Sequence, residues 1–153
     1  MPDHSLSKPS IGFDESDRTP SRRANRERSL VLVVDDDAIA LEVARERLER
    51  LGFDVATRDQ SLGTSRWIIE NKPDFVLLDL QMPALTGAEL ARLIRRHMTG
   101  IIVHSSLSPD ALARVARDVG AIGGISKGLT DKDFAREISR LMRQARAGIE
   151  GAP

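Results

Sequence analysis

Cysteine is absent from this 153-residue chain, and aromatic side chains are scarce, with one Trp, four Phe and no Tyr. The lack of cysteine excludes disulfides and thiolate metal sites and is compatible with a reducing compartment. Long apolar runs are also lacking. None approaches the roughly 18 to 20 residues that span a bilayer, and the N-terminus has no signal-peptide core. We therefore expect a cytoplasmic protein with no membrane partner.

An excess of charge of one sign is lacking as well, because 23 Lys and Arg balance 23 Asp and Glu. The overall charge therefore points to neither nucleic acid nor an acidic substrate. The one strongly basic segment, Arg18–Arg28, holds five arginines and one glutamate. It lies in an Arg- and Ser-rich extension, residues 1–29, that is too poor in large apolar residues to fold and is expected to be disordered. A solvated tail is favoured there over a nucleic-acid-binding arm.

From Ser29 onward, short apolar runs alternate five times with longer amphipathic segments. Continuous apolar runs are typical of parallel strands covered on both faces. The repeated alternation, with right-handed crossovers, favours a doubly wound α/β fold: a five-stranded parallel sheet with helices on both faces. We predict one domain over residues 30–146 and a short flexible tail over 147–153. The predicted strands are residues 30–34, 53–57, 75–80, 101–105 and 122–126.

The predicted helices are residues 38–51, 61–71 and 88–97, one opened by Ser108 and ending at Gly120, and a last one opened by Thr130. Their apolar positions predict the buried faces. In the first helix the predicted inward residues are Ala40, Ala44, Leu48 and Leu51. In the helix over 88–97 they are Leu90, Leu93 and Ile94.

Polar side chains stand where the predicted strands end, which is where open α/β sheets bind ligands. The first strand is followed by Asp35 and Asp36, the third ends at Asp79, the fourth at Ser105, and the fifth precedes Lys127. Carboxylates brought together repel one another and require a cation. Oxygen ligands in an incomplete cage suit Mg²⁺, which is commonly shared with a phosphate oxygen.

Phosphoryl chemistry follows from that set of residues, because such catalysis depends on positioning and on positive charge near the phosphoryl oxygens. Lys127 would supply a fixed charge and Ser105 a hydroxyl donor. Only four lysines occur in the chain, against 19 arginines, so a lysine at this strand end is notable. An aspartate can itself accept the phosphoryl group.

Four motifs, VLVVDDD, FVLLDLQMPALTG, IIVHSS and GGISKG, occur in this order along the chain. Together they resemble the receiver domain of bacterial response regulators in two-component signalling, over roughly Ser29 to Ala145. The resemblance implies the flavodoxin-like strand order 2-1-3-4-5. It also implies a histidine kinase or a histidine phosphotransfer protein as the phosphoryl donor.

By that resemblance Asp79 is the phosphoacceptor, and Ser105 and Lys127 contact the phosphoryl group. Mg²⁺ would be held by Asp36 directly, by Asp35 through water, by Asp79, and by the backbone carbonyl of Gln81. Two positions depart from the family pattern. Gly124 stands where receivers usually carry an aromatic residue, and Gly128 replaces the usual cis-proline after the lysine. These glycines put the usual output surface of the family in question.

We therefore predict a single-domain response regulator, not an enzyme beyond its own phosphorylation and dephosphorylation. It would signal to an unknown protein partner by contact or by onward phosphotransfer. The alternative is a receiver-like interaction module that works without phosphorylation. A nucleotide-binding domain is disfavoured, because neither a P-loop nor GxGxxG is present. An aspartyl phosphatase is disfavoured because position 81 is Gln.

Two further residues near these motifs are assigned structural roles. Asp37, the third acid of VLVVDDD, is predicted to cap the helix that follows it. His104 precedes Ser105 on the same strand and therefore points to the opposite face of the sheet, where we expect a partly buried core histidine.

Overall fold

The structure is a computed structural model that describes residues 26–98 and 100–150. Strands and helices alternate along the chain, as the sequence predicts. The strands are β1 (Leu30–Val34), β2 (Asp54–Arg58), β3 (Phe75–Asp79), β4 (Ile101–Ser105) and β5 (Gly123–Ser126). The helices are α1 (Ala38–Arg50), α2 (Thr64–Asn71), α3 (Gly87–Ile94), α4 (Pro109–Asp118) and α5 (Asp131–Glu150).

All five strands are parallel and lie in the order β2-β1-β3-β4-β5, which confirms the predicted doubly wound sheet. The register brings the carboxyl ends of the strands level. Val34 pairs with Leu78, Asp79 with His104, and Ser105 with Ser126. The residues that follow β1, β3, β4 and β5 therefore meet at one edge of the sheet, which we call the carboxyl edge.

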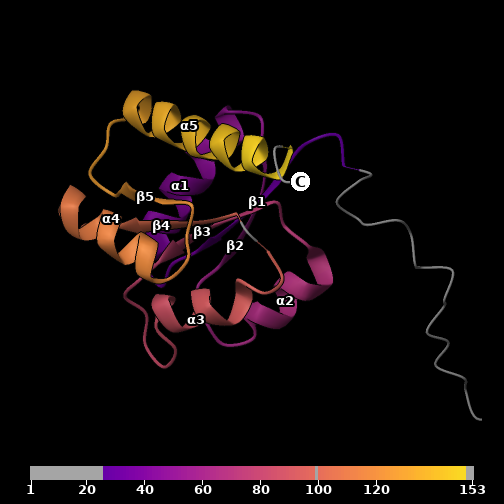
Figure 1. The fold of residues 1–153 in the computed structure, drawn as a ribbon, viewed down its shortest axis with the longest axis vertical. Helices are drawn as coiled ribbons and strands as arrows, with labels where there is room; N and C mark the ends of the chain where they lie inside the picture. The colour runs from indigo at the N-terminus through magenta and orange to yellow at the C-terminus, as the bar shows by residue number, and fades with distance from the viewer. Residues whose placement is uncertain (1–25, 99, 151–153) are drawn as a thin grey trace, which may run out of the picture.

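The sheet separates two hydrophobic cores, one on each face (Figure 1). Leu32 and Val34 of β1 face the core formed with α2, α3 and α4, whereas Val31 and Val33 face the core formed with α1 and α5. Both sets are fully buried, and burial of such side chains contributes roughly 1.5–3 kcal/mol each. Burial on both faces explains why the strands read as continuous apolar runs.

Two side chains predicted to face inward, Leu51 and Leu93, are exposed, and a third, Ala40, is only half-buried. Leu51 is 39% exposed because it lies after the last turn of α1, whose buried stripe is Leu41, Ala44 and Leu48. Leu93 is 53% exposed, since the inward positions of α3 are Gly87, Leu90, Ala91 and Ile94. The i, i+3, i+4, i+7 spacing leaves position 93 on the outer side.

Polar side chains start most of the helices at the carboxyl edge. The Asp37 carboxylate accepts hydrogen bonds from the backbone N–H of Ile39 and Ala40, which confirms its predicted role as the cap of α1. Ser108 caps α4, also as predicted. Helix α2 starts at Thr64, three residues later than predicted, after a left-handed Gly63 with no side-chain cap.

The predicted tail boundaries differ from the observed elements. Helix α5 extends to Glu150, four residues beyond the boundary predicted at 146. Most of the predicted N-terminal extension, residues 1–25, lies outside the described residues, as do 151–153. The described part is packed on the domain: Arg26 donates to the backbone carbonyls of Asn71 and Lys72, and Arg146 donates to the Ser29 hydroxyl over 2.8 Å.

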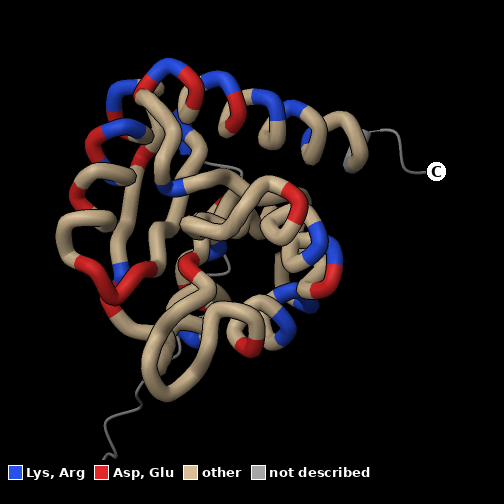
Figure 2. The backbone as a smooth tube through the Cα atoms, turned by 90° about the vertical axis from the view of Figure 1, so that its left-hand side faces the viewer, with Lys and Arg blue, Asp and Glu red and all other residues tan. Residues whose placement is uncertain are grey.

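Charges of both signs occur in the first half of α5, whereas the charged residues Arg140, Arg143 and Arg146 that follow are all basic (Figure 2). Several are paired within the helix, as Arg140 is with Glu137. None of the helices in the described part of the chain combines the length and apolar character needed to cross a membrane.

Candidate functional site

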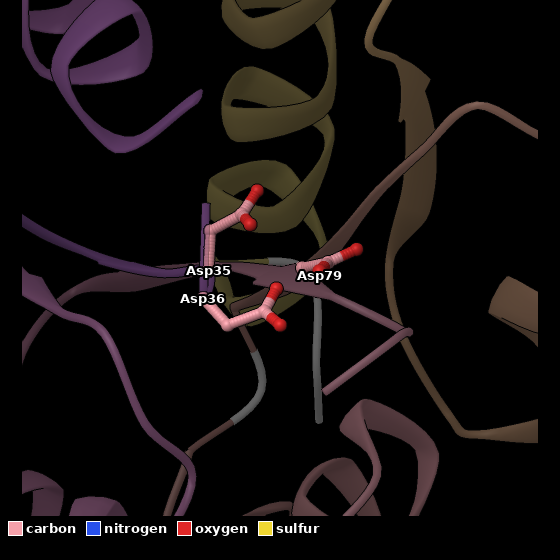
Figure 3. A group of neighbouring side chains, drawn as sticks. All are labelled: Asp35, Asp36 and Asp79. Carbon is pink, nitrogen blue, oxygen red and sulfur yellow. The ribbon is translucent and has the colours of Figure 1, made fainter. Parts of the chain in front are cut away.

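Three carboxylates meet at the carboxyl edge of the sheet (Figure 3). Asp35 and Asp36 follow β1, and Asp79 is the last residue of β3. One oxygen from each lies within 4.8 Å of the others. Asp35 and Asp79 are buried, at 1% and 5% exposure, whereas Asp36 is open to solvent. Separate strands thus bring together the acids that the sequence predicted to converge.

Lys127 places an ammonium group between two of these acids. Its Nζ lies 2.7 Å from Asp35 Oδ2 and 3.3 Å from Asp79 Oδ1. Burial alone would lower the pKa of Lys127, but its hydrogen bond to Asp35 and the charges of Asp79 and Asp35 outweigh burial and raise it. The lysine is therefore a fixed positive charge beside Asp79 at neutral pH.

The carboxyl group of Asp79 still titrates above its ordinary range. Burial raises its pKa most, and the negative charge of Asp35 raises it further. Lys127 and the hydrogen bond from the backbone N–H of Gln81 act in the opposite direction without compensating fully. The ionised carboxylate of Asp79 is thus disfavoured, mainly by burial and secondly by the charge of Asp35. A cation bound beside it would favour the ionised form.

Ser105 completes the set at the end of β4. Its side chain is 5% exposed, and its hydroxyl oxygen accepts a hydrogen bond from the backbone N–H of Leu107 over 3.2 Å. The hydroxyl proton remains available to a group in the adjoining cavity. That cavity, of about 400 Å³, is lined by every predicted site residue: Asp35, Asp36, Asp79, Gln81, Ser105 and Lys127.

The donor set fits a magnesium ion. Three carboxylates supply oxygen ligands, the cavity beside them has room for water molecules, and no nitrogen or sulfur ligand competes. Mg²⁺ favours oxygen ligands and keeps several waters when it binds through a few carboxylates. The residues that would hold it are Asp35, Asp36 and Asp79, and Gln81 lines the same cavity.

Neighbouring polar residues lie outside this set, as predicted. Asp37 is engaged in capping α1. His104 is 6% exposed on the opposite face of β4, with its ring edge-on to Phe134 at 6.1 Å. Burial, followed by the charge of Lys127, lowers the pKa of His104 to about 4. It is a neutral core histidine at physiological pH.

One position that supports the site was missed in the sequence. Gly87 opens α3 directly beneath the end of β3, where a Cβ atom would lie 1.9 Å from the Asp79 carbonyl oxygen and 2.7 Å from Leu80 Cα. Only glycine permits this approach of helix to strand. The available signal was the Thr-Gly pair after QMPAL, in which Thr86 also forms a capping box with Glu89.

A second feature that the sequence did not predict lies away from the acids. Gly124 of β5 is covered by Leu112 of α4, whose Cγ would be 2.5 Å from a Cβ at position 124. A groove of about 550 Å³ runs along α4, β5 and α5 beside this contact. It is larger than the acidic cavity, but its lining includes none of the three carboxylates, Ser105 or Lys127.

Known proteins point to the same family as the motifs. Residues 31–139 match the response regulator receiver domain family. The chain is similar to the transcriptional regulatory protein KdpE of Mycobacterium tuberculosis, at 30% identity over 80% of this chain and 54% of that protein. It is also similar to the phosphate regulon transcriptional regulatory protein PhoB of Pseudomonas aeruginosa, at 27% identity over 80% of this chain and 56% of that one.

A comparison with solved structures points to the same family. A response regulator receiver domain protein from Clostridium thermocellum superimposes with a TM-score of 0.67 at 27% identity, over 78% of this chain and 98% of that one. The chain spans about half the length of the curated relatives it matches. With its sheet order, acidic cavity and matched residues, the chain belongs to the response regulator receiver domain family.

Proposed function

We propose that Asp79 accepts a phosphoryl group from a phosphohistidine of a sensor histidine kinase or a histidine phosphotransfer protein, with Mg²⁺ bound. The observation that carries this proposal is the placement of Asp79 Oδ1 3.3 Å from the Lys127 ammonium, in one cavity with Asp35, Asp36 and Ser105. Mg²⁺, when bound, would neutralise charge on the phosphoryl oxygens.

In the proposed step, a carboxylate oxygen of Asp79 attacks phosphorus and forms a P–O bond. The P–N bond to the donor imidazole breaks, and the imidazole leaves with the electron pair. Lys127 pairs with the phosphoryl oxygens, and the Ser105 hydroxyl donates a hydrogen bond to one of them. Hydrolysis of the acyl phosphate returns Asp79 to its starting state, and the chain catalyses no other reaction in this proposal.

We further propose that the phosphorylated receiver passes its signal to a protein partner, by contact or by onward phosphotransfer, in the cytoplasm where such kinases act. Only a phosphoryl group that stabilises one conformer over another can change partner affinity. Binding to nucleic acid is not part of the proposal, because the chain has as many acidic as basic residues and no excess of positive charge.

The test is to incubate the protein with MgCl₂ and acetyl phosphate and to measure its intact mass. We expect one added phosphoryl group on the native protein, none on Asp79→Asn, and none when EDTA replaces the metal. Asp37→Asn is the matched control: it removes an acid from the same run, but one that caps α1, and it should still be modified.

A native protein that is not modified, and that also shows no Mg²⁺ binding by titration calorimetry, would overturn the proposal. The receiver-like interaction module that works without phosphorylation would then be the better description. The departures at Gly124 and Gly128 are the observations that favour this second candidate.

A further inference from the structure

The connection between β5 and α5, residues 127–130, carries Lys127 and contains Gly128. Glycine gives this connection a freedom that other residues would remove. Its surroundings do not restrict it either, since the atom nearest to a Cβ at position 128 would be Ser126 Oγ, at 3.7 Å. The position of Lys127 therefore requires some other constraint on the connection.

Arg47 of α1 supplies contacts to the far end of this connection. Its Nε donates to Asp131 Oδ1 over 2.7 Å, and its Nη2 donates to the backbone carbonyl of Leu129 over 3.1 Å. The guanidinium also lies over the Phe134 ring, 5.2 Å from its centroid. The Arg47 side chain is only 16% exposed. A planar guanidinium with several fixed donors is suited to such simultaneous contacts.

The near end of the connection is held by the sheet. The backbone N–H of Lys127 donates to the Ser105 carbonyl over 2.9 Å. At the far end, the Thr130 hydroxyl accepts from the N–H of Asp133 and starts α5. Gly128 lies between these anchors, with one hydrogen bond from its N–H to Ser126 Oγ. Arg47 thus adds a polar link from α1 to the backbone of Leu129, whose side chain also packs against the core between α1 and α5.

We propose that Arg47 is a positioning residue for Lys127: it holds the β5–α5 connection so that the lysine ammonium stays between Asp35 and Asp79. Arg47 does not line the acidic cavity, so it acts through the backbone and does not contact the phosphoryl group. Its effect on phosphorylation rests on the function proposed above, but its effect on the connection does not.

Arg50 provides a matched control on the same helix. It also reaches Asp131, at 3.4 Å, but it is 66% exposed, and its other ion pair, with Glu46 at 3.8 Å, lies within its own helix. Arg50→Ala removes the same charge and a similar side chain without releasing Leu129. Arg47→Lys is a second control, because it keeps the charge but loses the planar arrangement of donors.

The first readout is hydrogen exchange of the amides of residues 127–130, measured in the full chain without any phosphodonor. We expect faster exchange in Arg47→Ala and Arg47→Lys and unchanged exchange in Arg50→Ala. The second readout is the rate of Asp79 phosphorylation by acetyl phosphate at saturating Mg²⁺. Misplacement of a catalytic group by about 1 Å can cost up to about 100-fold in rate, and we expect a loss of about tenfold in Arg47→Ala.

Rescue separates positioning from general stability. Alanine fits at position 128, where the backbone is not left-handed, and replacement of glycine restricts the chain. Arg47→Ala combined with Gly128→Ala should therefore regain much of the phosphorylation rate and slow the exchange. In Arg47→Ala the phosphorylation rate at saturating acetyl phosphate should fall, whereas the acetyl phosphate concentration that gives half of this rate should not change.

Unchanged exchange at residues 127–130 in Arg47→Ala would overturn the inference, whether or not the protein is phosphorylated. A loss of melting temperature with unchanged exchange and unchanged rate would do the same, since it would assign Arg47 to joining α1 and α5 only. If the native protein is not phosphorylated at all, the proposed function fails, and the exchange experiment still decides the role of Arg47.

Discussion

The sheet is built differently at the carboxyl ends of its inner strands β1 and β3 than along its edge strand β5. We call the first region the Asp79 end and the second the β5 end. Around β1 and β3, three acids and Lys127 converge, and the backbone approach of α3 at Gly87 admits no side chain. Around β5, two consecutive glycines leave the strand bare, and Leu112 and Leu141 from the flanking helices cover it beside a groove of about 550 Å³. The Asp79 end therefore tolerates little change, whereas the β5 end is filled by side chains that can adjust.

The largest effect is expected from a substitution at the Asp79 end. In Gly87→Ala the new Cβ would meet the Asp79 carbonyl oxygen at 1.9 Å, and backbone must move to relieve the overlap. We expect a loss of about 3 kcal/mol, the upper end of the usual cost of overpacking. Phosphorylation of Asp79 should fall by about 100-fold, since its carboxylate is displaced. Denaturant unfolding and intact-mass kinetics measure the two effects.

Gly148→Ala is the control for that substitution, because nothing lies within 4 Å of a Cβ at position 148. In an exposed helix it should be neutral or stabilise the protein by up to about 1 kcal/mol. Native stability and native phosphorylation in Gly87→Ala would show that the approach of α3 to β3 is not required.

The next effect concerns His104, which lies between the two ends: its Cα pairs with Asp79 on one side and Ile125 on the other. Its pKa is lowered from 6.5 to about 4 in the folded protein. The unfolded chain therefore takes up a proton on His104 at a higher pH than the folded protein does. The free energy of unfolding is unaffected by His104 above pH 6.5 and falls as the pH is lowered from 6.5 to about 4. Between pH 7 and 4 the native protein should lose about 3 kcal/mol more than His104→Leu.

Urea unfolding of both proteins across this pH range provides the measurement, and the shared acids cancel in the comparison. Parallel curves for the two proteins would mean that His104 is accessible to protons in the folded state. Phosphorylation at neutral pH should persist in His104→Leu, because the ring faces away from the acidic cavity.

The smallest effect sharpens the description of the β5 end. Gly124→Ala places a Cβ 2.5 Å from Leu112 Cγ, and we expect a cost of about 1–2 kcal/mol while the leucine moves. In a Leu112→Ala background the same substitution should cost less, with a coupling of about 1 kcal/mol in a double-mutant cycle. Gly128→Ala, which meets no close atom, is the control. Strictly additive costs would contradict the contact between Leu112 and Gly124.

The sequence was sufficient for the fold and for the convergence of the acids, because parallel topology places the residues after each strand at one edge. The strand order alone is enough to bring Asp35, Asp79 and Lys127 together. The sequence was also sufficient to predict the capping role of Asp37, because that role depends on local geometry.

Other features depended on contacts between distant segments. The need for Gly87 arises from how closely α3 approaches Asp79, which no local pattern encodes. The cover of Gly124 comes from Leu112 on a preceding helix, and the contact of Arg47 with Leu129 joins residues 82 positions apart. Leu51 and Leu93 were misplaced because one lies after the last turn of its helix and the other beside its inward stripe.

Arg26 is bound to the carbonyl end of α2, and Ser29 to Arg146 of α5, at the edge of the sheet where β1 begins. The acidic cavity lies at the other edge. A fluorophore or an immobilisation tag attached at position 26 would therefore lie at the edge of the sheet opposite Asp79. A domain tethered to a sensor surface at that position would keep its acidic cavity away from the surface.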